Sequence, residues 1–120
     1  DLDSAAMDRL RDAVGRVDLG HTIRVETADF FARHPSELTD GPGLVVLNPP
    51  YGLRMGNIDA ARSGIEAVIR KLRTHYAEWR FGILFPDRKT LSRRPAARTV
   101  YRISHGGSNR YLATGEIGRE

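Results

Sequence analysis

The feature that most constrains the fold is an apolar run that ends in two prolines. Leu44 to Leu47 are all aliphatic, and they are followed by Asn48, Pro49 and Pro50. Proline cannot donate a hydrogen bond to a β-ladder and cannot continue a helix, so the run predicts a short strand that stops at Asn48. Because Asn48 and Pro49 each precede a proline, both are biased towards extended backbone, and the segment that leaves the strand is stiff.

The residues at this strand end carry groups that can hold a planar amine. Asn48 offers a side-chain amide oxygen, Pro49 offers a backbone carbonyl oxygen, and Tyr51 offers a flat aromatic ring. Two acceptors can take the two hydrogens of an exocyclic amine while the ring stacks on the planar group that carries it. A plainer interpretation is that these residues only terminate a strand.

The sequence Asn-Pro-Pro-Tyr after an apolar strand resembles motif IV of the S-adenosylmethionine-dependent amino-methyltransferases, which act on bases in DNA or RNA and on glutamine amides in proteins. The longer run NPPYGLRMG resembles the subgroup, associated with THUMP domains, that methylates the guanine amine in ribosomal or transfer RNA. That subgroup usually reads NPPYGER, so Leu53 stands where glutamate is expected. The resemblance therefore favours RNA guanine, with DNA adenine and protein glutamine as the rival substrates.

This resemblance implies a role for each residue of the motif. Asn48, Pro49 and Tyr51 would form the catalytic grip on the amine, with Asn48 also beside the cofactor. Pro50, Tyr51 and Arg54 would hold the substrate base. The implied reaction is in-line transfer of a methyl group from a sulfonium, for which positioning can supply much of the rate.

The resemblance also implies that the first part of the chain binds S-adenosylmethionine. Asp1, at the end of the family's second strand, would accept from the ribose hydroxyls. Thr22 to Thr27 alternate like a strand, after which Asp29 would accept from the adenine amine and Phe30 would pack on the adenine ring. The alternatives are that Asp1 is only a chain end, that Asp29 caps a short turn, and that Phe30 is core.

The remaining elements resemble, across nearly the whole chain, the α/β Rossmann-like sheet of class I methyltransferases with its terminal antiparallel hairpin. Apolar spacing and breakers predict a first helix capped by Asp3 or Ser4 and ended by Gly20, and a long amphipathic helix from Asn57 or Asp59 to about Trp79. The charged face of the long helix is typical of a solvated surface. Further predictions are a helical turn at 36–38, a strand at 81–85, a basic helix at 88–94, and strands at 99–104 and 110–117 around a turn.

The family's glycine-rich loop, which lets the backbone approach the cofactor, should precede the acid at Asp1. No glycine of the chain occupies such a position. We therefore expect residues 1–120 to be the C-terminal part of a single catalytic domain, truncated so that the first strand and this loop are missing, and inactive alone. Strand edges exposed by the truncation predict dimerisation or strand exchange.

The composition predicts a polyanionic partner and argues against a membrane protein or a metal-binding protein. The formal net charge of +4 predicts a polyanionic partner, here RNA, with Arg54, Lys89, Arg93 and Arg94 as candidate phosphate contacts. A non-catalytic nucleic-acid-binding module is the rival interpretation. No apolar run reaches membrane-spanning length, and the four histidines lack ligand spacing, so neither a membrane segment nor a metal site is expected. The absence of cysteine fits a reducing cytoplasm.

Overall fold

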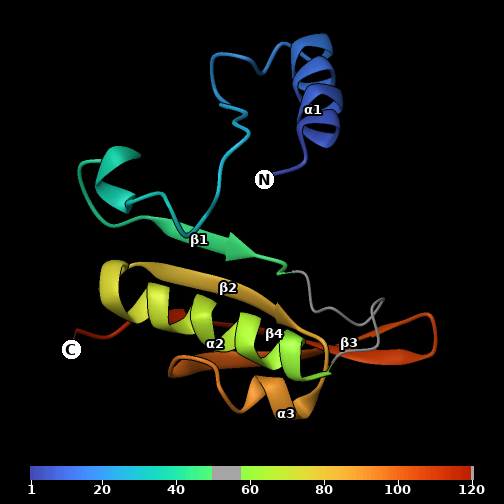
Figure 1. The fold of residues 1–120 in the computed structure, drawn as a ribbon, viewed down its shortest axis with the longest axis vertical. Helices are drawn as coiled ribbons and strands as arrows, with labels where there is room; N and C mark the ends of the chain where they lie inside the picture. Colours follow the sequence, from blue (N-terminus) through green and yellow to red (C-terminus); the bar gives the residue numbers. More distant parts are fainter. Residues whose placement is uncertain (50–57, 120) are drawn as a thin grey trace. The chain divides into compact units, whose positions relative to one another are not determined.

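The structure is a computed structural model that describes residues 1–49 and 58–119. The chain divides into two compact units, Asp1–His34 and Pro35–Glu120, and each is described by itself. Figure 1 shows the elements of both units along the chain. Within the described residues, no helix is long and apolar enough to cross a membrane.

The second unit is built on a four-stranded sheet in the order β1-β2-β4-β3. The strands are β1 (Leu44–Leu47), β2 (Arg80–Phe85), β3 (Ala97–His105) and β4 (Ser108–Glu116). The pair β1 and β2 is parallel, whereas β4 runs antiparallel to both of its neighbours. This mixed sheet with a closing hairpin confirms the predicted α/β fold class.

The helix α2 (Ile58–His75) provides the crossover that a parallel pair requires. It runs along the sheet in Figure 1. The predicted apolar stripe is buried, since the exposed fractions of Ile65 and Leu72 are 1% and 0%. Alternate residues of the sheet supply the rest of this core: Phe81, Ile83, Phe85, Tyr111 and Ala113 are all buried.

The prediction that α2 continues to Trp79 is wrong, because the helix ends at His75. Glu78 adopts a left-handed conformation with φ of 67°, and its N–H donates to the carbonyl of Ile117 at 2.8 Å. The chain therefore turns towards the end of β4 instead of extending the helix. The apolar spacing continues past the helix because Tyr76 stays in the core, where burial raises the pKa of its hydroxyl.

Trp79 packs at the amino end of the parallel strand pair formed by β1 and β2. Its ring lies edge-on to Tyr76, with the centroids 5.1 Å apart. A Cβ added at Gly43 would lie 3.1 Å from the same indole, so a larger residue before β1 would require the indole to shift by a few tenths of an ångström. The indole therefore packs against the backbone at Gly43, directly before β1.

The terminal hairpin is confirmed, and its turn is shorter than the predicted 105–109. Gly106 and Gly107 both have positive φ, 56° and 80°, which is the backbone of a tight type I′ turn. Residues on either side can therefore pair up to His105 and Ser108. Two smaller elements are η1 (Pro35–Glu37), at the predicted helical turn, and α3 (Arg88–Leu91), shorter than the predicted 88–94.

In the first unit, α1 (Ser4–Arg16) is capped by Asp3, as predicted, through a bond from the Ala6 N–H to Oδ1 at 3.0 Å. It ends before Gly20, contrary to the prediction, because Asp18 already takes the left-handed conformation that terminates a helix. The N–H of Leu19 then bonds to the carbonyl of Val14 at 3.1 Å.

The prediction of a strand at 22–27 is wrong, because the described structure has no strand there. A strand requires a ladder with a neighbouring chain segment. Among the described residues of this unit, only Asp1 bonds in ladder fashion to this segment, through the backbone bonds that flank Thr27.

We predict that Gly115→Ala destabilises the second unit by about 1–3 kcal/mol, because a new methyl group in a packed site forces shifts. A Cβ at Gly115 would lie 3.0 Å from the Ala96 carbonyl oxygen and 3.1 Å from the Phe81 ring. Urea unfolding followed by fluorescence of the single tryptophan measures the loss. Gly118→Ala is the matched control, since its Cβ would meet nothing within 4 Å, and equal stability of the two variants would contradict the prediction.

Candidate active site

The predicted amine grip lies at the carboxyl end of the parallel strand pair. β1 ends at Leu47, which pairs with Ile83 of β2, and Asn48 and Pro49 follow directly. Asn48 is exposed and Pro49 is half-buried. Ligands of open α/β sheets bind outside the carboxyl ends of the parallel strands. The strand therefore presents the Asn48 amide and the Pro49 carbonyl at the edge where such a sheet binds its ligand.

The neighbouring strand end is held rigidly by a capped turn. After β2, Asp87 caps α3: its Oδ1 accepts from the Thr90 N–H at 2.7 Å and from the Thr90 hydroxyl at 2.9 Å. Thr90 is only 4% exposed. The Asp87 carboxylate is thus engaged in capping, and we assign it no part in catalysis.

In the first unit, the predicted ribose-binding and adenine-binding acids are close neighbours along paired backbone. The Asp1 nitrogen donates to the Glu26 carbonyl at 3.5 Å, and the Ala28 N–H donates to the Asp1 carbonyl at 2.9 Å. These two backbone bonds flank Thr27, although neither Asp1 nor Thr27 belongs to a strand. The Asp1 backbone therefore lies beside Thr27, two residues before Asp29.

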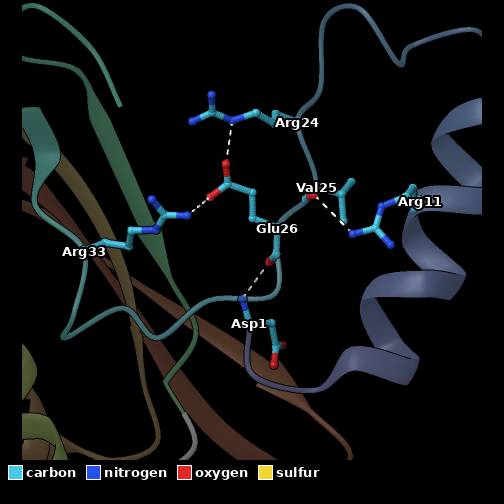
Figure 2. Close-up of polar contacts among 6 residues, drawn as sticks. All are labelled: Asp1, Arg11, Arg24, Val25, Glu26 and Arg33. Carbon is cyan, nitrogen blue, oxygen red and sulfur yellow. Dashed lines mark hydrogen bonds and ion pairs between the residues drawn. The ribbon is translucent and has the colours of Figure 1, made fainter. Parts of the chain in front are cut away.

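Glu26 braces the segment that carries Asp29. Its two carboxylate oxygens bind Arg24 at 2.8 Å and Arg33 at 2.6 Å, as Figure 2 shows. Arg11, from α1, donates to the Val25 carbonyl at 3.4 Å in the same view. Side chains from three places in the first unit therefore contact the segment on the amino side of Thr27.

Asp29 uses one carboxylate oxygen to form a turn and leaves the other available as an acceptor. Its Oδ1 accepts from the Phe31 N–H at 2.9 Å, and its carbonyl accepts from the N–H groups of Ala32 and Arg33. The alternative interpretation of Asp29 as the cap of a short turn is therefore confirmed. No hydrogen bond to Oδ2 occurs within the described part of the chain, so the turn and an adenine contact are compatible. Phe30, half-buried, lies edge-on to Phe31 at 5.4 Å between centroids.

The predicted site residues thus fall into three groups. Asp1, Asp29 and Phe30 lie together in the first unit, and Asn48 and Pro49 lie together in the second. Pro50, Tyr51 and Arg54 lie outside the described residues, as does most of the NPPY turn. The roles of all these residues stay predictions.

Of the predicted phosphate contacts, Lys89 and Arg93 are exposed on and just after α3. Arg94 differs, because its guanidinium turns back to the Leu91 carbonyl at 3.0 Å and its Nε is buried without a hydrogen-bond partner in the described structure. Arg94 is therefore poorly placed to hold a phosphate.

The sequence analysis missed a basic groove between α2 and α3. Two hollows that meet at Arg93 form it, and we call them together the α2–α3 groove. Its charged lining residues are Arg62, Glu66, Arg70, Arg73, Lys89 and Arg93. The four on α2 were interpreted as a solvated helix face. A sequence signal for the groove existed: the charged residues recur on one side of α2, and a basic helix, α3, follows the next strand, β2.

No group of three or more His, Cys, Asp or Glu residues that could hold a metal ion occurs among the residues that the structure describes.

No protein-family model matches the chain. The chain is 37% identical over 83 residues to the ribosomal RNA large subunit methyltransferase K/L of Hahella chejuensis, a match that covers 69% of this chain and 12% of that protein. It is 28% identical to the protein of the same name from Aeromonas hydrophila, across 100% of this chain and 19% of the relative.

The fold matches a solved structure as well. SMU.472, a protein assigned as a methyltransferase and crystallised with SAH, superposes with a TM-score of 0.80 at 18% identity, over 100% of this chain and 31% of that one. The chain thus spans well under a third of the curated relatives' lengths. It is a distant homologue of one segment of the ribosomal RNA large subunit methyltransferases K/L, and it has the Rossmann-like fold of part of a methyltransferase domain.

Proposed function

We propose that the chain is part of an enzyme that uses S-adenosylmethionine to methylate an exocyclic amine of a base in RNA, with guanine in ribosomal or transfer RNA as the target. The observation that carries the proposal is the position of Asn48 and Pro49 at the carboxyl end of a strand in a parallel pair. Two oxygen acceptors thus lie at the edge of the sheet where ligands of such sheets bind.

The residues of the first unit fit the proposed cofactor. The Asp1 backbone bonds on either side of Thr27, two residues before Asp29, and Asp29 Oδ2 has no partner among the described residues. A carboxylate can accept from ribose hydroxyls at Asp1 and from an adenine amine at Asp29, while Phe30 offers an apolar ring. S-adenosylmethionine, when bound, would supply a methyl group on a sulfonium, from which the neutral thioether is a good leaving group.

The contribution of the chain is positioning. Asn48 Oδ1 and the Pro49 carbonyl would accept the two amine hydrogens, which directs the nitrogen lone pair away from both acceptors. Tyr51, with Pro50 and Arg54, would hold the base after it leaves its stack. Fixing two reactants in this way can contribute several kcal/mol, about 7–11 in well-oriented systems, so no strong general base is required.

RNA is favoured over the rival substrates by the names of the relatives, all ribosomal RNA methyltransferases, and by the net charge of +4. DNA adenine, protein glutamine and non-catalytic binding of nucleic acid are the alternatives that the first experiment separates. Action on ribosomal RNA would place the protein in the cytoplasm.

We predict that Asn48→Ala lowers methyl transfer to total RNA by about 100-fold or more, because a misplaced amine forfeits the orientation effect. The assay follows label from S-adenosylmethionine into RNA with the intact protein. Asn109→Ala, at an exposed asparagine of β4, is the matched control and should keep full activity. Label in DNA or protein would overturn the substrate class, and full activity of Asn48→Ala would overturn the amine grip.

Asp29→Asn should weaken cofactor binding about tenfold, since an amide NH2 in place of Oδ2 leaves the adenine amine without an acceptor. Asparagine keeps one oxygen for the Phe31 N–H, so the turn survives. Calorimetric titration with S-adenosylhomocysteine measures the change, and Asp12→Asn, at an exposed position of α1, serves as control. Unchanged affinity would remove Asp29 from the cofactor site.

The predicted dimer remains a proposal. β1 forms one edge of the four-stranded sheet, and its Leu44 and Val46 are 55% and 68% exposed. An apolar strand edge favours pairing with another chain. We expect light scattering at high protein concentration to report a dimer, and a monomer under those conditions would contradict this expectation.

A further inference from the structure

The α2–α3 groove carries a concentration of positive charge. Five cationic side chains and one carboxylate, Glu66, are its charged lining residues. Arg70, Arg73 and Lys89 have no ion-pair partner within the described part of the chain. Like charges gathered along a hollow repel one another and raise the local concentration of anions. The groove is therefore suited to bind an anion.

The groove begins beside the proposed active edge. α3 follows the carboxyl end of β2, and α2 starts on the same side, after β1 and the residues outside the description. From Arg62 to Arg73 the groove follows α2 for about 16 Å at the rise of an α-helix. A chain of phosphates that left the active edge would meet successive cations along this path.

The one carboxylate is placed to compete with such a ligand. Glu66 Oε1 binds Arg93 Nη1 at 2.9 Å, and the two side chains are 42% and 61% exposed. Ion pairs with this exposure contribute little to stability, so Arg93 can exchange its partner at small cost. Glu66 thus occupies the site where an incoming phosphate would bind.

We propose that the α2–α3 groove binds the phosphate backbone of the RNA substrate beside the target nucleotide, with Arg62, Arg70, Arg73, Lys89 and Arg93 as contacts and Glu66 as a competing anion. The proposal rests on the proposed function for the choice of RNA. Backbone contacts of this kind carry no sequence information, and they position the strand while the NPPY turn selects the base.

The test measures anisotropy of a fluorescein-labelled single-stranded RNA with the intact protein over a range of salt concentrations. Replacing Arg70 and Arg73 together by Gln should raise Kd about tenfold at physiological salt and flatten the plot of log K against log salt by about 1–2 units. Glu66→Gln should change affinity in the opposite direction, because it removes the competitor and frees Arg93. A gain of affinity is not a result that misfolding produces.

The matched control replaces Arg9 and Arg16 by Gln, which removes the same charge from exposed positions on α1. An equal loss in this control would show that net charge alone acts, and it would overturn the proposal. Unchanged affinity in the Arg70 and Arg73 variant, or equally tight binding of polyglutamate, would overturn it as well.

Methyl transfer is measured in parallel to separate the two proposals. If the intact protein binds RNA through the groove but transfers no methyl group, the proposed function fails while the groove assignment stands. If it methylates RNA and the groove variants bind as well as the parent, the groove assignment fails alone.

Discussion

The rest of the second unit depends on one constraint, the parallel pairing of a strand that must end at two prolines. Pro49 cannot extend a ladder, and because β1 and β2 are parallel, the chain connects them by a crossover. The crossover is α2, and its buried stripe, with Leu72 at 0% exposure, covers the sheet. The same pairing brings the ends of β1 and β2 to one edge, where Asn48 and the capped turn at Asp87 follow. Fold and site therefore have a common cause.

Much of this unit was predictable because its elements are fixed locally. The apolar run before the prolines, the stripe of α2 and the Gly106–Gly107 turn each encode their structure within a few residues. The errors have a different origin. Thr22 to Thr27 alternate like a strand but form no ladder among the described residues, and α2 ends early because Glu78 bonds to Ile117, far along the chain. Long-range partners decide these cases, and a sequence pattern does not name them.

The candidate site likewise divides into features that local sequence predicts and features that depend on long-range contacts. The prolines of the NPPY motif predict where β1 ends. The roles that the family resemblance implies for Asp1 and Asp29 stay predictions, although the Asp1 backbone bonds on either side of Thr27. The α2–α3 groove depends on a long-range arrangement, because a charged helix face is ordinary until the fold brings another basic element beside it. Arg93 closes it here by pairing with Glu66. Arg94 is the opposite case: the sequence predicts a phosphate contact, but in the fold its guanidinium bonds to the Leu91 carbonyl.

Trp79 has a consequence for spectroscopy. The indole lies against Gly43 and Tyr76 at the amino end of the parallel pair, whereas the proposed chemistry belongs to the carboxyl end. As the single tryptophan of the chain, it is an intrinsic probe of one end of the sheet. Its emission should follow unfolding and strand separation and stay nearly silent when a ligand binds at the opposite end. Titrations that follow ligand binding by fluorescence accordingly need an extrinsic label.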